Sequence, residues 1–260
     1  MLAEMRQPSP DTQLGLSHVT IDVTPADARD GRDAREEDGR GGLTPERATA
    51  LGVDTGRYAY LRGRLEDQSP VGQEAYAATL RHDLTRVRAY PREGLDSDTL
   101  TSLDVVESAY DLALDGFALP YGDTPVGNWR TAPYVVIQNV GEYLALPRFM
   151  QSNHKVENGD DADAYIERME QMPAVFDGEL ARIRAARGMG VVPPSFLLDK
   201  ALRQMEQTIA SAGKGELFAD DLRAKLNAKG MPESMREMAE QKTREIGAAY
   251  ERICEARGMN

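Results

Sequence analysis

Cysteine and histidine, on which most zinc sites and thiol chemistry depend, are scarce in this sequence of 260 residues. It has one cysteine, Cys254, and three histidines, His18, His82 and His154. A single cysteine excludes an intramolecular disulfide and any cysteine-rich zinc site. Cys254 lies in the helical context ERICEAR. We expect it at the edge of the core, because a catalytic thiol needs a more basic setting.

Basic residues are also few, with 31 lysines and arginines against 43 acids and a formal net charge of −12. DNA, RNA and anionic membranes bind basic faces, so we expect neither a nucleic acid nor a membrane as partner. No apolar run is long enough to span a membrane, and the first residues, MLAEMRQPSPDTQ, lack the apolar core of a signal peptide. The sequence therefore predicts a protein that is cytoplasmic by default.

The second half of the segment 1–42 lacks the apolar side chains that a folded core needs. Thr24 to Gly42 reads TPADARDGRDAREEDGRGG, with no large apolar residue, so it buries too little surface to offset the entropy of ordering. Val19, Ile21 and Val23 alternate as in a strand, but no partner strand is evident. We expect a disordered tail over 1–42, rich in acids, arginine and glycine, and one helical domain over 43–260.

From Leu43 onwards, apolar residues recur at spacings of three and four, which is typical of amphipathic helices. The first three predicted helices follow the start signals Thr44-Pro45, Ser69-Pro70 and Asp96-Ser97, and the second and third form an antiparallel pair. A fourth helix is predicted from Pro133, with interruptions near Gly141 and Pro147, and a fifth over 160–187, with a kink or break at Pro173. Three more are predicted after it: one that begins at the cap Ser195, a short one over 217–226, and a last one from Pro232 almost to the end. The predicted fold class is all-α, an irregular bundle of about seven or eight amphipathic helices.

The segment from Phe117 to His154 differs from the rest of the chain. It holds the only tryptophan, Trp129, four of the fourteen prolines, and amides interleaved with aromatics. A segment rich in proline, glycine and aromatics between helices forms a shaped, partly irregular wall, and such walls often line binding sites.

His154 is the one histidine whose surroundings suggest a metal. It stands three residues before Glu157, and a histidine at position 158 would complete the zinc motif H-x-x-E-H. Position 158 is asparagine, which cannot replace an imidazole in a zinc site. We therefore interpret His154 as a capping or hydrogen-bonding residue before the helix at 160, and we predict no metal ligand, no catalytic residue and no cofactor in this chain.

Several motifs, taken in order along the chain, resemble sequences of the bacterial family called "domain of unknown function 885". They are LTPERATALGVDTG, PYVVIQNVGEY with LPRFMQSNH, DADAYIERMEQMPAVFDGEL, and GVVPPSF. The resemblance covers Leu43 to Ala212, and it implies a helical, zinc-peptidase-like architecture. In full-length relatives an H-E-x-x-H motif lies further downstream, and the sequence up to Asn260 contains none. No catalytic or metal residue is therefore carried over.

By analogy with that family, we expect this chain to be the non-catalytic N-terminal part of a zinc-dependent, peptidase-like hydrolase. It would form one wall of a substrate cleft and be inactive without the H-E-x-x-H half, binding a peptide-like substrate only together with that half. The candidate cleft-facing residues are Tyr134, Gln138 and His154. The alternative is a free-standing helical binding module, or a truncated gene product without a function of its own.

If this chain is one part of a larger enzyme, we also expect it to self-associate when it is alone. Without a covering half, the apolar side chains of the wall would have too little to pack against. They are Tyr121, Trp129, Tyr134, Val136, Tyr143 and Phe149.

Overall fold

The protein is all-α, as predicted. The computed structural model describes residues 43–124, 126, 132–214, 216–232 and 235–258. Within them lie eight α-helices and one 3-10 helix, and the only β pairings are isolated bridges. The elements are α1 (Pro45–Leu51), η2 (Gly56–Gly63), α2 (Pro70–Ala89), α3 (Ser97–Phe117), α4 (Glu142–Ser152), α5 (Gly159–Gly188), α6 (Ser195–Gly213), α7 (Leu217–Ala228) and α8 (Arg236–Gly258). The predicted tail over 1–42, its strand at 19–23 and Trp129 lie outside the described residues.

The three α-helices before residue 118 begin at the predicted caps. Thr44 caps α1, its hydroxyl accepting a bond from the Arg47 N–H, and Gly52 ends the helix with a φ of 70°. Ser69 and Asp96 cap α2 and α3 in the same way. The helix η2 was not predicted, because GRYAYLRG has neither a cap nor the helical period.

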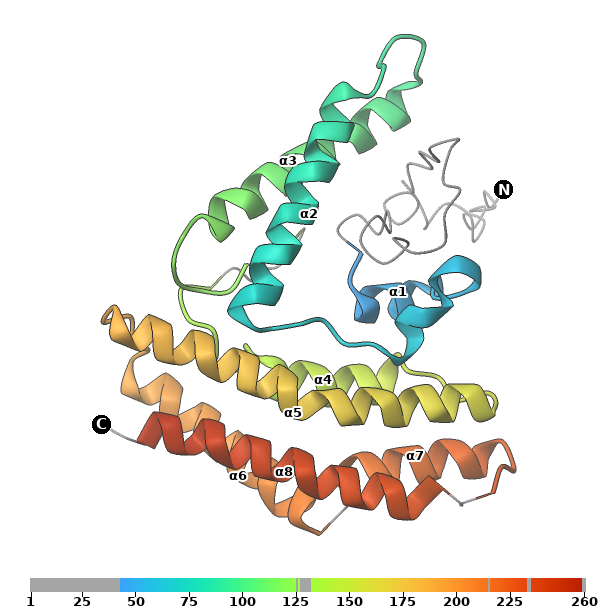
Figure 1. Ribbon diagram of the computed structural model, residues 1–260, viewed down its shortest axis with the longest axis vertical. Coiled ribbons are helices and arrows are strands. Elements are labelled where there is room, and N and C mark those ends of the chain that lie inside the picture. Colours follow the sequence, from blue (N-terminus) through green and yellow to red (C-terminus); the bar gives the residue numbers. More distant parts are fainter. Residues whose placement is uncertain (1–42, 125, 127–131, 215, 233–234, 259–260) are drawn as a thin grey trace, which may run out of the picture.

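The pair α2 and α3 forms an antiparallel arm that projects from the rest of the molecule (Figure 1). The side chains that the two helices bury are mostly aliphatic, and Tyr76 meets Phe117 edge-on at a ring-centroid distance of 5.9 Å. Ion pairs from Arg88 and Arg92 to acids of α3 join the two helices near the tip.

The predicted helix from Pro133 is wrong. Residues 133–136 are irregular, and Ile137 and Val140 exchange two backbone hydrogen bonds of 3.1 Å across a tight turn. Asn139 in that turn has a φ of 68°, and Gly141, with a φ of 126°, immediately precedes α4. Because neither value is compatible with a right-handed helix, the helix begins only at Glu142.

The helix α4 continues through Pro147, where an interruption was predicted. Proline has no N–H, so it cannot donate the usual bond to the carbonyl four residues earlier, which belongs to Tyr143. That carbonyl accepts a hydrogen bond of 2.9 Å from the buried Tyr250 hydroxyl of α8. A tertiary contact thus replaces the missing helical bond.

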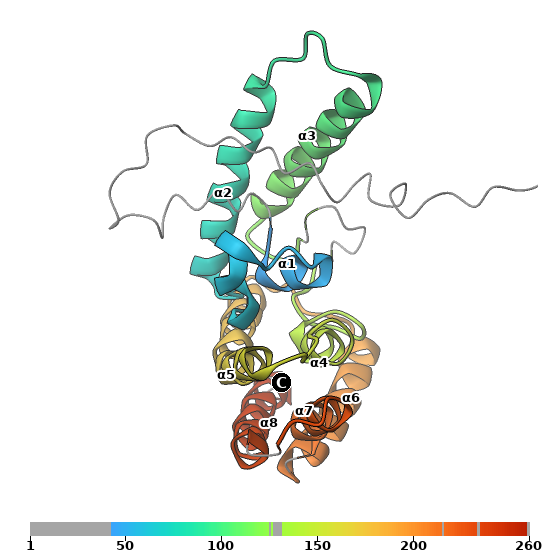
Figure 2. The same ribbon diagram turned by 90° about the vertical axis from the view of Figure 1, so that its right-hand side faces the viewer.

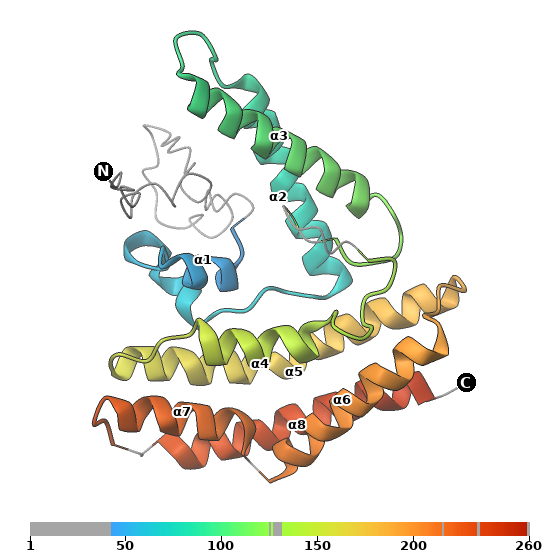
Figure 3. The same cartoon turned by 180° about the vertical axis from the view of Figure 1, so that it is seen from behind.

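The helix α5 is the central element of the body. It is unbroken across Pro173, so the predicted division does not occur. In Figures 2 and 3, α1 and η2 lie on one side of the α4–α5 layer, and α6, α7 and α8 lie on the other. In the core, the Phe176 ring of α5 packs against Tyr250 of α8, with ring centroids 4.6 Å apart, and the Tyr165 ring of α5 packs against His154, with ring centroids 5.1 Å apart.

The C-terminal helices follow the prediction closely, with two shifts at their starts. Residues 191–194 form the expected non-helical link, but Ser195 is the first residue of α6 rather than its cap, which is Pro194. Pro232 precedes α8 and is not part of it. No helix in the described part of the chain combines the length and apolar character needed to cross a membrane.

Candidate functional site

Arg168 is the most deeply buried charge in the described part of the chain, with no exposed surface. Its position on α5 directs the side chain toward α1 and η2. There its Nη2 donates to the Thr49 hydroxyl at 2.7 Å and the Leu61 carbonyl at 3.1 Å, while its Nε donates to the Arg64 carbonyl at 2.9 Å. Burial lowers the pKa of Arg168 to about 10, which leaves it charged at neutral pH. The guanidinium therefore acts as a fixed connector between α5 and the segment before α2.

His154 completes this network as a neutral imidazole. The remaining Arg168 nitrogen, Nη1, lies 2.7 Å from His154 Nδ1, and His154 Nε2 lies 2.9 Å from the Asp161 carbonyl oxygen. Because a guanidinium only donates, Nδ1 is the acceptor, and Nε2 carries the proton that binds Asp161. Burial lowers the pKa of His154 to about 4, and the cations Arg168 and Lys225 lower it further.

These contacts decide the role of His154. Its two ring nitrogens are engaged, and an arginine faces the one that lacks a proton, so the geometry does not fit a zinc ligand. Among the described residues, no group of three or more histidine, cysteine, aspartate or glutamate side chains has the arrangement of a metal site. The hydrogen-bonding role predicted from the sequence is confirmed.

A second buried polar cluster surrounds the N-terminus of α4. The Glu142 N–H donates to the Glu179 carboxylate at 2.9 Å, which supplies the cap that Gly141 lacks. Arg182 donates to Gln68 Oε1 at 3.0 Å and to Asp123 Oδ1 at 2.8 Å.

Burial shifts the proton affinities of this cluster. It raises the pKa of Glu142 well above the usual range of a carboxyl, and the nearby Glu179 adds to that shift. Burial also raises the pKa of Glu66 to about 8, with a further contribution from Glu46. Carboxyl groups with a raised pKa occur at structural clusters as well as at functional sites, so the shifts alone assign no chemistry.

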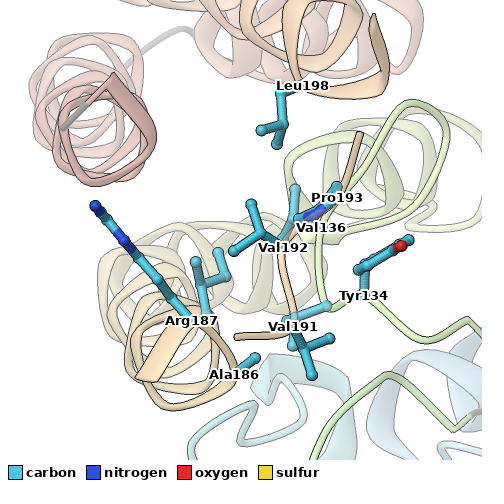
Figure 4. Close-up of a pocket in the computed structure, with 10 residues that line it drawn as sticks. Tyr134, Val136, Ala186, Arg187, Val191, Val192, Pro193 and Leu198 are labelled. Atoms are coloured by element: carbon cyan, nitrogen blue, oxygen red, sulfur yellow. The ribbon is translucent and has the colours of Figure 1, made fainter. Parts of the chain in front are cut away.

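An apolar pocket lies between the irregular segment before α4, the end of α5 and the link to α6 (Figure 4). It encloses about 500 Å³ of space not filled by atoms, part of it open to solvent. Its walls are aliphatic apart from one tyrosine ring and one guanidinium. The lining residues are Tyr134, Val135, Val136, Ile183, Ala186, Arg187, Val191, Val192, Pro193 and Leu198.

The three candidate cleft residues do not form one site. Tyr134 lines the pocket, Gln138 lies half-buried in the turn before α4, and His154 is buried after the end of α4. Since α4 has 11 residues, its two ends are about 16 Å apart. The structure thus places Tyr134 and Gln138 at one end of this helix and His154 at the other.

The apolar side chains of the wall are better covered than the sequence predicted. Val136 and Tyr143 are buried to 1 % exposure and Phe149 to 9 %, which corrects the expectation that they lack packing partners. Tyr121 is exposed, as expected. Self-association stays a prediction.

Two charged residues of the site were missed, although the sequence contained a signal. Arg168 and Glu179 lie in register with the apolar stripe of α5, at spacings of three and four from core residues such as Tyr165, Met172 and Phe176. A charge within an apolar stripe is buried with the stripe and needs buried partners.

The comparison with solved structures finds a longer relative with the same fold. A crystal structure from Colwellia psychrerythraea, described as a "putative lipoprotein", matches with a TM-score of 0.71 at 16 % sequence identity. The match covers 85 % of this chain and 39 % of that one, so this chain spans well under half of the relative's length. At this identity the likeness concerns the fold alone.

No curated protein matches the sequence significantly. The model of one protein family matches residues 45–256, which is most of the chain and extends beyond the resemblance expected from the motifs. The family is described as "Bacterial protein of unknown function (DUF885)". The chain therefore belongs to the DUF885 family.

Proposed function

We propose that this chain is a non-catalytic part of a peptidase-like hydrolase and forms one wall of its substrate cleft. The observation that carries the proposal is the apolar pocket between residues 134–136 and the α5–α6 link, which includes the predicted cleft residue Tyr134. A concave, mostly aliphatic surface with a few polar groups at its margin is the usual form of a ligand site. The pocket accommodates an aliphatic side chain of a peptide-like ligand.

The same proposal assigns no bond cleavage to this chain. Its three histidines are far apart in the sequence, so no H-E-x-x-H motif is present, and the contacts of His154 do not suit a metal. The 39 % coverage of the longer relative agrees with a role as one part of a larger protein. The catalytic groups would come from a part that this sequence does not contain.

A direct test uses N-acetyl-leucinamide as the ligand and N-acetyl-glycinamide, which lacks the side chain, as its control. We expect the leucine compound alone to shift NMR signals of residues around the pocket, without being hydrolysed. Val192→Asp places a charge at the half-exposed pocket margin and should abolish the shifts. Val71→Asp, on the exposed face of α2, is the matched control and should bind normally.

Equal responses to both compounds, or binding unchanged by Val192→Asp, would refute the pocket as a ligand site. Hydrolysis of N-acetyl-leucinamide by the purified chain would refute its non-catalytic role.

A free-standing binding module remains the second candidate, because all lining residues of the pocket come from this one chain. The affinity for a leucine-containing peptide distinguishes the two functions. A module binds it fully by itself, whereas a cleft wall binds it weakly until the complementary catalytic part is added.

A further inference from the structure

Arg182 of α5 contacts both chain segments that connect the arm to the body (Figure 1). On the incoming side its Nη1 donates to Gln68 Oε1 at 3.0 Å, two residues before α2 begins. On the outgoing side its Nη2 donates to the Gly122 carbonyl at 2.9 Å and to Asp123 Oδ1 at 2.8 Å. Only 10 % of the Arg182 side chain is exposed. Three charge-assisted hydrogen bonds at this depth hold the guanidinium in one place.

The outgoing segment extends this anchoring to the pocket. Asp123 and Ala132 exchange two backbone hydrogen bonds, of 2.8 and 3.1 Å. Gly122 approaches the same residue so closely that a Cβ on it would lie 2.7 Å from the Ala132 carbonyl oxygen. Ala132 stands two residues before Tyr134, where the irregular wall of the pocket begins. The pair of residues that the guanidinium holds therefore fixes the start of this wall.

The far end of the irregular wall has an anchor of its own. The Ile137 carbonyl accepts a hydrogen bond of 3.1 Å from the Tyr143 hydroxyl of α4. Between the two anchors lie Val135 and Val136, which line the pocket and are buried to 4 % and 1 % exposure. Their positions relative to α5 thus depend on how both ends of a short segment are held.

We propose that Arg182 is a positioning residue of the apolar pocket and acts through Asp123. Arg182 itself does not line the pocket, but Ile183, the next residue of α5, does. The bond from Arg182 to Asp123 therefore sets how far the α5 wall lies from the irregular wall. A site whose walls are already in place binds more tightly, because binding has less ordering to offset. The inference deepens the proposed function and rests on it, since it concerns the same pocket.

The experiment compares variants of two acceptors of the same guanidinium. Asp123→Ala removes the bond on the side of the pocket, at a side chain that is 31 % exposed, so the variant should fold. Gln68→Ala removes the bond on the side of the arm and is the matched control. Asp123→Asn keeps an oxygen that accepts from Arg182 and should restore the original behaviour. We expect the methyl NMR signals of Val135 and Val136 to shift in Asp123→Ala and in neither of the other two variants.

The affinity for N-acetyl-leucinamide is the second measurement. Asp123→Ala should weaken it by about tenfold, which is the order of one lost charge-assisted hydrogen bond. Gln68→Ala and Asp123→Asn should bind like the original chain, and Arg182→Gln should resemble Asp123→Ala in both measurements. Circular dichroism checks that each variant folds. If Arg182→Gln does not fold, the two Asp123 variants and the Gln68 control decide the question by themselves.

The methyl signals separate this inference from the proposed function, because they need no ligand. If the original chain does not bind N-acetyl-leucinamide, the proposed function fails, and the methyl signals of the variants still decide whether Arg182 positions the wall. Signals of Val135 and Val136 that Asp123→Ala leaves unchanged, or that Gln68→Ala shifts equally, would overturn the positioning role. An affinity that Asp123→Ala leaves unchanged would overturn it as well, while the pocket would stay a ligand site.

Discussion

The hydrogen bond between α8 and α4 provides a quantitative test of how α4 tolerates a proline. The Tyr250 hydroxyl donates to the Tyr143 carbonyl at 2.9 Å, at the position where Pro147 supplies no N–H. In Tyr250→Phe this carbonyl stays buried and loses that donor. A buried group left without its partner costs about 1–3 kcal/mol, so we expect the free energy of unfolding to fall by about 2 kcal/mol. For a domain of this size that lowers Tm by about 4–8 °C.

A double-mutant cycle isolates the contribution of the proline. In Pro147→Ala the new N–H of residue 147 can donate to the Tyr143 carbonyl, so the Tyr250 hydroxyl is no longer essential. We expect Tyr250→Phe to cost at least about 1 kcal/mol less in the Pro147→Ala background than in the original chain. Urea denaturation of the four proteins measures the free energies.

The matched control is Tyr165→Phe, which removes a buried hydroxyl that bonds to Phe218 and Asp221 rather than to α4. Its effect should add to that of Pro147→Ala within about 0.5 kcal/mol. If Tyr250→Phe were equally additive with Pro147→Ala, the tertiary bond would not be what lets α4 continue through the proline.

Two further predictions follow from the buried acids and from close packing. Because the pKa of folded Glu66 lies at about 8, against an ordinary value of 4.5, folding takes up a proton between these values, and the free energy of unfolding falls as pH rises through this window. The free energy of unfolding of Glu66→Gln should therefore rise relative to that of the original chain as pH rises from about 4.5 to 8. Urea denaturation measures both free energies, and a difference between them that stays the same over this pH range would contradict the prediction. In Gly178→Ala the new Cβ would lie 2.6 Å from the Ser69 nitrogen, so the free energy of unfolding, measured by thermal melting, should fall by at least about 2 kcal/mol. Gly188→Ala, with no atom within 4 Å of its Cβ, is the control, and an equal loss there would refute the steric account.

Local signals predicted most of the fold. Thr44 and Asp96 each have a side chain that caps a helix whatever the rest of the molecule does, and their helices begin where expected. Pro147 was misjudged because the hydroxyl that compensates for it belongs to Tyr250, 107 residues from the carbonyl that it serves. No local pattern contains such a contact. By contrast, the error at Pro133 was avoidable, since Asn139 and Gly141 are residues that commonly adopt a positive φ.

The site was less predictable than the fold. His154 was correctly interpreted as a hydrogen-bonding residue, because the missing ligand at Asn158 was visible in the sequence. Its principal partner, Arg168, was not identified, since an arginine in an amphipathic helix usually faces solvent. The pocket depends on how residues 134–136 lie against the end of α5, which only the tertiary structure determines.

The central place of α5 has a consequence for biosynthesis. Its lower face, including Phe176, is covered by α8, and some 70 residues separate Phe176 from Tyr250. At ordinary rates of translation, the emergence of Tyr250 from the ribosome follows that of Phe176 by about 4–15 s, and during this time the face of α5 is exposed without its covering helix. The nascent chain is therefore an expected client of ribosome-associated chaperones until α8 leaves the exit tunnel.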